Sequence, residues 1–127
     1  IVSIGAVGLE RLCMVVNGLK SVQDVDYLKP FYDALQIESK RELVGESLRA
    51  LHRIYSDMKK YGVELSGNRR RKINRMIRTV SESGLSMDTI KKLLKINAES
   101  QPWHPELSDS VDESAGKIRY YKELRIK

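Results

Sequence analysis

Helical periodicity is clearest in the stretch Gly45-Glu46-Ser47-Leu48-Arg49-Ala50-Leu51-His52-Arg53-Ile54-Tyr55-Ser56-Asp57-Met58-Lys59-Lys60-Tyr61-Gly62. Its large apolar residues stand three and four positions apart, so an α-helix carries them on one face. These residues are Leu48, Leu51, Tyr55 and Met58. Gly62 follows at once, and glycine ends helices because it adopts the left-handed backbone without a steric penalty. The stretch therefore predicts a helix over residues 45–61 with one buried face.

The same spacing predicts three further helices after this one. The first covers residues 69–81, and the second begins at Ser86, a residue type favoured at N-caps. Prolines interrupt the pattern after residue 101, and Ser108 or Asp109 can cap a last helix. The core residues expected of the three helices are Ile73, Met76, Ile77 and Val80, then Ile90, Leu93 and Leu94, then Val111, Ala115 and Ile118.

Two shorter helices and a strand are predicted before residue 45. Asn17 and Gly18 end the first helix, because both residue types tolerate left-handed backbone. Asp26 can cap the second helix, with Pro30 in its first turn, where a missing N–H costs least. Residues 1–4 are apolar and β-branched, which indicates a buried strand, so the expected fold class is mainly α with one terminal strand. The expected core residues are Leu12, Val15, Val16 and Leu19, then Leu28, Phe31, Tyr32 and Leu35.

Bulk composition is that of a soluble globular domain: of 127 residues, 41% are hydrophobic and 31% are charged. No apolar run approaches the roughly 20 residues that cross a bilayer, so no membrane partner is expected. The single Cys13 excludes an internal disulfide and favours a reducing compartment, the cytoplasm or an organellar matrix. No metal site is predicted, because His52 and His104 are far apart and lack supporting cysteines or acids, so both are interpreted as structural.

The formal net charge of +6 favours an anionic partner, nucleic acid above all. Cations concentrate in the segment that starts at Asn68, and no acid occurs over residues 65–81. The cations are Arg69, Arg70, Arg71, Lys72, Arg75 and Arg78. Arg71, Arg75 and Arg78 share one face of the expected helix, where their mutual repulsion makes RNA phosphate a favourable partner. A solvated basic face is the alternative interpretation.

A second anion signal lies near the start of the chain, in Gly8-Leu9-Glu10-Arg11. A glycine turn opens a helix there, and Arg11 stands in its first turn. Backbone N–H groups and the positive helix end suit a nucleotide phosphate, to which Arg11 adds a forked charge. A surface ion pair between Glu10 and Arg11 is the alternative.

The stretch over residues 8–36 resembles the end of the class II catalytic domain of alanyl-tRNA synthetase. The matching motifs are Gly8-Leu9-Glu10-Arg11, Asp24-Val25-Asp26 and Pro30-Phe31-Tyr32, at matching spacing without gaps. The resemblance continues more loosely in Leu48-Arg49-Ala50-Leu51, in Gly62-Val63-Glu64-Leu65-Ser66-Gly67-Asn68, in Ile73-Asn74-Arg75-Met76-Ile77-Arg78 and in Trp103-His104-Pro105-Glu106-Leu107.

The resemblance implies two domains and a set of site residues. Residues 1–36 would end the catalytic domain, and residues 37–127 would form a helical tRNA-recognition domain. Arg11 would bind the ATP γ-phosphate, and Gly8 would let the backbone approach the nucleotide. Asn68 would read the acceptor stem, although an asparagine also suits a helix cap. The whole enzyme would use ATP, Mg²⁺, alanine and tRNA, whereas this fragment alone is expected to be inactive.

Departures from the family pattern keep other functions open. Ala6 stands where the family has a glycine, and the Asp-His-x-Arg cluster of the family's long helix is missing around His52. The alternative is a non-catalytic, synthetase-derived module that binds RNA in a ribonucleoprotein assembly. A helical interaction domain with no nucleic-acid role is the third possibility. Trp103 is expected to pack against the helices, with stacking on a base as the alternative.

Overall fold

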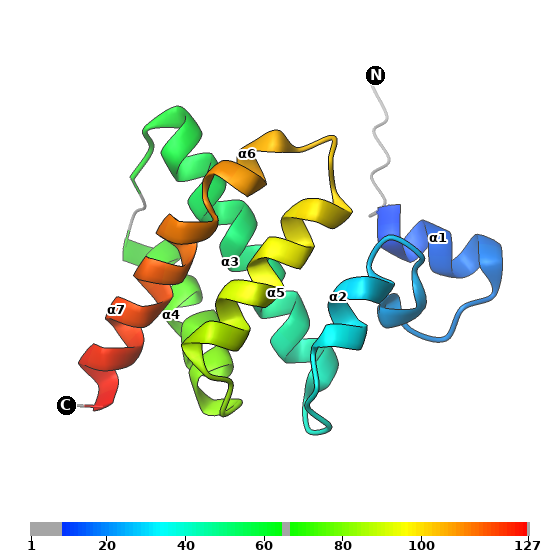
Figure 1. The fold of residues 1–127 in the computed structure, drawn as a ribbon, viewed down its shortest axis with the longest axis horizontal. Helices are drawn as coiled ribbons and strands as arrows, with labels where there is room; N and C mark the ends of the chain where they lie inside the picture. The colour runs from blue at the N-terminus through cyan, green and yellow to red at the C-terminus, as the bar shows by residue number, and fades with distance from the viewer. Residues whose placement is uncertain (1–8, 65–66, 127) are drawn as a thin grey trace, which may run out of the picture.

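The computed structural model describes residues 9–64 and 67–126, which form seven α-helices and one short 3₁₀ helix (Figure 1). In chain order these are α1 (Leu9–Asn17), η1 (Val22–Asp24), α2 (Lys29–Ala34), α3 (Arg41–Tyr61), α4 (Gly67–Glu82), α5 (Met87–Ser100), α6 (Pro105–Asp109) and α7 (Val111–Ile126). The described residues contain no strand, so the protein is mainly α as predicted. The strand predicted at residues 1–4 and the site residue Gly8 lie outside the described ranges.

Helix α3 lies at the centre and packs against α4, α5, α6 and α7 (Figure 1). Its predicted apolar stripe is confirmed, because Leu48, Leu51 and Tyr55 are buried. Met58 and Met76 are only partly buried, at the edge of the same core. Removing apolar surface from water contributes about 25 cal/mol per Å², so this shared core is the main source of stability. The surrounding helices and the connection between α4 and α5 contribute the buried residues Ile73, Ile77, Val80, Leu85, Ile90, Leu93, Leu94, Ala115 and Ile118.

Helix α2 belongs to this same hydrophobic core. Its predicted apolar face is confirmed, because Leu28, Phe31, Tyr32 and Leu35 are all buried in one cluster with the residues of α3, α4, α5 and α7. The Tyr32 ring fits against Gly45, where an added Cβ would lie 2.9 Å from the ring carbon Cζ. The core is therefore continuous across residue 36, the predicted end of the catalytic domain, and that domain boundary stays a prediction.

Several predicted helix ends are confirmed by backbone geometry. Gly62 closes α3 with φ of 62°, and Gly84 follows α4 with φ of 79°, both in the left-handed region. Ser86 is the N-cap of α5, where its hydroxyl accepts the N–H of Thr89 at 3.2 Å. These residues keep the connections short, so neighbouring helices return directly onto α3.

The starts of α2 and α3 differ from the prediction. α3 begins at Arg41 rather than at residue 45, and the Arg41 side chain donates hydrogen bonds to the carbonyls of Tyr32 and Leu35. Residues 35–40 form the loop between the two helices, and Arg41 fastens the start of α3 to the end of α2. Asp26 does not cap α2, because its Oδ1 accepts the neighbouring N–H of Tyr27 at 2.7 Å. The N-cap position is taken by Leu28, which makes no side-chain cap hydrogen bond.

The cap predicted for the last helix was also wrong. Ser108 and Asp109 lie inside the short helix α6, and α7 begins after Ser110. Ser110 is buried, and its hydroxyl donates to the Glu106 carbonyl at 3.0 Å. Two successive helices therefore stand where the sequence pattern predicted one.

Helix α1 lies at one side of the assembly (Figure 1), and its predicted core face is wrong. Leu12, Val15 and Val16 are exposed, and no residue of α1 is fully buried. Cys13 and Met14 are partly buried and pack against the core instead. None of the described helices combines the length and apolar character needed to cross a membrane.

Candidate nucleic-acid interface

One face of α4 holds the helix to the core and leaves the opposite face to solvent. Ile73, Ile77 and Val80 are buried, and the helical repeat of about 3.6 residues places Arg71 and Arg75 on the other side. All six predicted cations of this helix are exposed. Arg71, Lys72, Arg75 and Arg78 lie on the outer side of α4, and Arg69 and Arg70 are exposed in its first turn. These six cations together are called here the α4 basic face.

Most of the cations on the α4 basic face have no internal partner. Arg78 pairs with Glu82 at 3.1 Å, in an exposed contact one helical turn away. Among the described residues, the other five cations make no salt bridge. A run of unpaired arginines on one helix is electrostatically unfavourable by a few tenths of a kcal/mol per neighbouring pair, roughly.

Asn68 lies on this same face but not in the predicted turn. It is the second residue of α4 and is exposed, so it neither precedes the helix nor occupies the cap position. Spacings of three and seven residues put Asn68 in line with Arg71 and Arg75. The face thus offers one amide beside two guanidinium groups.

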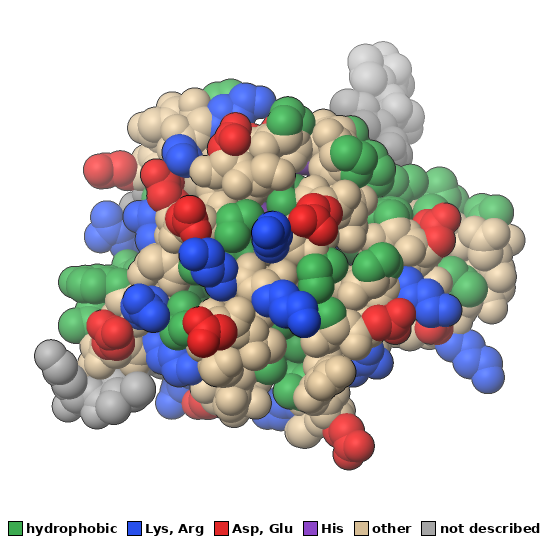
Figure 2. Space-filling model, viewed as in Figure 1, with side chains coloured by type: hydrophobic (Ala, Val, Ile, Leu, Met, Phe, Trp, Pro, Cys, Tyr) green, Lys and Arg blue, Asp and Glu red, His purple; other side chains and the backbone are tan. Residues whose placement is uncertain are grey.

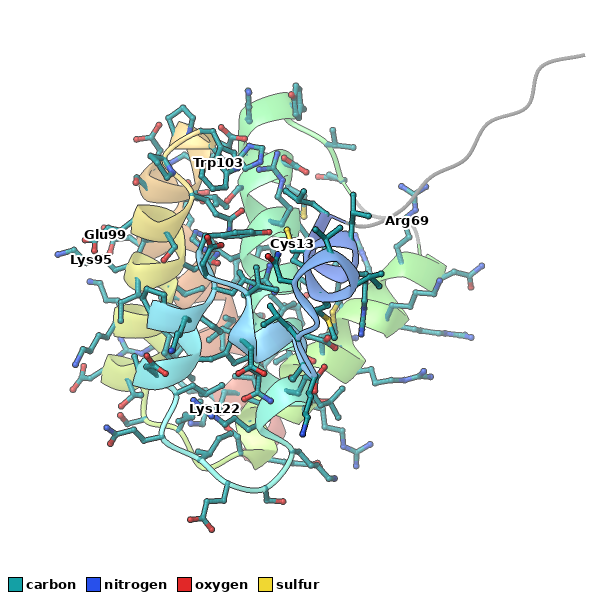
Figure 3. All side chains as sticks on the ribbon, turned by 90° about the vertical axis from the view of Figure 1, so that its right-hand side faces the viewer. Cys13, Arg69, Lys95, Glu99, Trp103 and Lys122 are labelled. Atoms are coloured by element: carbon teal, nitrogen blue, oxygen red, sulfur yellow. The ribbon has the colours of Figure 1, made fainter. Side chains whose placement is uncertain are left out.

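The opposite side of the molecule has a different charge pattern. Figure 3 shows Arg69 and Lys95 on opposite sides, projecting from α4 and α5 respectively. On the α5 side, basic and acidic side chains intermingle (Figure 2), and Lys91 pairs with Asp112 at 3.0 Å. The α5 side therefore mixes charges of both signs, whereas residues 65–81 contain no acid.

Arg11 lies in a second charged region, between α1, α3 and α5. It lines a cleft of about 350 Å³ together with Glu46, Arg49 and Arg53 of α3 and Gln101 after α5. Its side chain is 62% exposed and stands 3.6 Å from Glu46 Oε1. The sequence analysis missed the three α3 residues, although their spacing of three and four positions puts them on one helix face.

Glu10 fixes α1 to the rest of this cleft. Its Oε1 accepts a hydrogen bond from the Tyr27 hydroxyl at 2.6 Å and another from Arg49 Nη2 at 3.1 Å. Burial raises the pKa of Glu10, but the Tyr27 hydroxyl, a backbone N–H and Arg49 together outweigh burial and bring it below its ordinary value. Burial and the neighbouring Glu10 carboxylate raise the pKa of Tyr27. Glu10 is therefore held ionised as an anchor.

His52 is a structural residue, as predicted. It is fully buried, and its Nε2 lies 2.8 Å from the Leu107 carbonyl oxygen, which can only accept a hydrogen bond. Burial, together with Arg53, lowers the pKa of His52 against the effect of the Leu107 hydrogen bond. His104 lies elsewhere, 3.4 Å from Glu106.

Comparison of the chain with protein-family models, with curated proteins and with solved structures gave no match. The geometry alone defines the class of protein, which is a helical domain with one basic face and a separate charged cleft. Arg11 belongs to the cleft, and the predicted RNA-binding residues from Asn68 to Arg78 belong to α4.

Proposed function

We propose that this protein binds RNA through the α4 basic face, as part of an aminoacyl-tRNA synthetase resembling alanyl-tRNA synthetase. One observation carries the proposal: five exposed cations that make no salt bridge within residues 9–64 and 67–126 lie on one helix together with Asn68. Residues 67–82 would bind the acceptor stem of tRNA. The whole enzyme would join alanine to tRNA using ATP and Mg²⁺.

The chemistry of the α4 basic face favours the repeated phosphates of an RNA backbone over a single small anion. Arg71 and Arg75 are four residues apart, about 6 Å along the helix axis, which lets them engage different phosphates. A planar guanidinium binds two phosphate oxygens at once. Asn68 adds an amide that can donate to and accept from a base edge. An RNA partner would also offset the repulsion between the cations.

A charge-matched pair of variants tests RNA binding. Arg71→Ala with Arg75→Ala removes two cations from the α4 basic face, and Lys92→Ala with Lys95→Ala removes two exposed cations from α5. Each lost phosphate contact flattens the plot of log affinity against log salt by about 0.7–0.9. The arginine variant is therefore expected to reduce the slope by about 1.5, measured with a blunt RNA duplex across several salt concentrations.

The lysine variant has the same net charge, so it separates a local contact from a general charge effect. It is expected to keep the wild-type slope. Equal slopes for the two variants, or RNA binding that does not respond to salt, would refute the proposal and favour a helical interaction domain.

For catalysis, we propose that Arg11 contacts the ATP γ-phosphate in the whole enzyme. Its exposed side chain and loose contact with Glu46 leave it able to reach a phosphate. Arg11→Ala in the full-length protein is expected to abolish alanine-dependent ATP–pyrophosphate exchange while binding of a blunt RNA duplex is unchanged. The chain of 127 residues alone is expected to show no exchange.

The second candidate is a non-catalytic RNA-binding module, favoured by Ala6 in place of a glycine and by the missing Asp-His-x-Arg cluster around His52. Full-length protein that binds RNA through the α4 basic face but shows no exchange would assign the chain to this candidate. If ATP–pyrophosphate exchange persists in the Arg11→Ala variant, Arg11 is not a catalytic residue.

A further inference from the structure

Trp103 is the only tryptophan in the chain. It was expected to pack against the helices, but it lies outside their core. It lies between α5 and α6, and it is 56% exposed. The edge-to-face contact with Tyr27, at 5.5 Å between ring centroids, holds the indole in place. A large aromatic ring that is fixed by one neighbour and open to solvent is a platform on which a flat ligand can stack.

Direct contacts connect this platform to the Arg11 cleft. The hydroxyl of Tyr27 donates to Glu10, which lines the cleft beside Arg11. Gln101, two residues before Trp103, also lines the cleft, and its amide donates to Asn97 at 3.0 Å. The cleft volume of about 350 Å³ falls within the range of roughly 300–1,000 Å³ found for small-molecule sites.

The charges in the cleft do not favour a ligand that is held by its negative charge alone. Arg49 is occupied by Glu10, and Arg53 contacts both Asp57 and Glu106 at 2.9 Å. Arg11 alone has a long contact and a mostly exposed side chain, so it is the cation best able to move onto a phosphate. A ligand must therefore gain much of its affinity from stacking, and a nucleobase offers a flat face for that purpose.

We infer that Trp103 and the Arg11 cleft together hold one unpaired nucleotide of an RNA strand. The base stacks on Trp103, its phosphate meets Arg11, and the Gln101 amide faces the base edge. The inference rests on the proposed function in taking RNA as the ligand. It is an alternative to the ATP contact proposed for Arg11, because one side chain cannot hold both phosphates at once, and its site lies apart from the α4 basic face. Single-stranded RNA is recognised in this way by an aromatic ring combined with a basic groove.

The emission of Trp103 provides a direct measurement, because no other tryptophan contributes. The intact chain is titrated with a blunt RNA duplex and with the same duplex carrying a short 3′ single-stranded extension. The extension is expected to quench the emission and to tighten binding, whereas the blunt duplex leaves the emission unchanged. Loss of stacking in Trp103→Ala is expected to reduce the affinity gained from the extension by about 5- to 150-fold.

Matched variants separate stacking from folding. Trp103→Phe keeps an aromatic ring and is expected to retain most of the gain, and Arg11→Gln is expected to reduce it without affecting the blunt duplex. Circular dichroism checks that each variant is folded. An extension that neither quenches Trp103 nor tightens binding would overturn the inference, as would quenching by free AMP equal to that by the RNA strand.

The α4 proposal fails independently of this one. Arg71→Ala with Arg75→Ala is expected to weaken the blunt and extended duplexes equally, which preserves the gain from the extension. Quenching by a single-stranded oligonucleotide without any duplex binding would refute the α4 proposal and support the cleft. Loss of the gain in the arginine double variant would count against a separate site at Trp103.

Discussion

His52 on α3 and Asn97 on α5 form a buried hydrogen bond, with 2.9 Å between His52 Nδ1 and Asn97 Nδ2. Because the other ring nitrogen faces the Leu107 carbonyl, Nε2 carries the proton and Nδ1 accepts from the Asn97 amide. The neutral imidazole therefore joins α3 to α5 and α6. Both ring nitrogens are satisfied only while the ring is uncharged.

Stability is predicted to fall as the pH drops below about 6.5. Burial holds the pKa of His52 below this ordinary value, so the unfolded chain binds a proton that the folded protein does not. The contribution is complete above about pH 6.5 and is lost progressively as the pH approaches the folded-state pKa, with a slope of up to about 1.4 kcal/mol per pH unit. Urea unfolding between about pH 7.5 and 5.5 measures it.

His52→Gln is predicted to be less stable at neutral pH but to lose this pH dependence. His104→Gln is the control, because His104 is partly exposed and contacts only Glu106 by a side-chain ion pair in the described structure. If His104→Gln flattens the pH profile and His52→Gln does not, the assignment of the titrating residue is wrong.

Gly45→Ala is predicted to destabilise the protein by about 1–3 kcal/mol, because the new methyl group must displace the buried Tyr32 ring. Gly116→Ala is the matched control within α7, where an added Cβ meets nothing within 4 Å. The control is predicted to stabilise by about 0.5–1 kcal/mol through helix propensity. Thermal unfolding of both variants measures the difference, and equal effects would contradict the close packing at Gly45.

Ser86→Ala is predicted to cost about 1 kcal/mol, because it removes the acceptor for the Thr89 N–H at the start of α5. Ser86→Asp is expected to retain the cap. Ser108→Ala, an exposed change in α6, provides the comparison. Chemical denaturation that ranks Ser108→Ala as the more damaging change would show that Ser86 contributes no cap.

Tyr27→Phe is predicted to loosen α1 while the helical core keeps its stability. The change removes the hydroxyl that donates to Glu10 at 2.6 Å and leaves the ring against Trp103. Since no α1 residue is fully buried, amide hydrogen exchange is expected to quicken over Leu9–Asn17 and to stay unchanged over Met87–Ser100. Equal exchange rates in α1 of the variant and the wild type would contradict this role for Tyr27.

Apolar periodicity predicted most of the helices and their buried faces, because the buried residues of each helix stand three and four positions apart. Leu48, Leu51 and Ile77 are examples. The same rule failed for Val15 and Val16, which are exposed. An apolar stripe identifies one side of a helix but does not show whether another part of the protein packs against that side. Short α6 was missed because five residues are too few to display a period.

The two parts of the candidate site differed in how far they could be predicted. The α4 basic face is local in sequence, so counting charges along one helix identified it. The cleft combines α1, α3 and α5, and contacts such as Glu10 with Arg49 span 39 positions. Helical spacing alone gives no register between such distant segments, so the partners of Arg11 could not be predicted.

Ionic strength acts on α4 in two opposing directions. The screening length is about 10 Å at 0.1 M, longer than the spacing of neighbouring cations such as Arg71 and Arg75, and it falls to about 3 Å at 1 M, so their repulsion weakens as the salt concentration rises. Added salt therefore relieves the self-repulsion of the unbound helix and makes it more stable, while the same ions compete with phosphate and weaken the complex. The conditions under which α4 binds RNA most tightly are those under which the unbound helix is least stable.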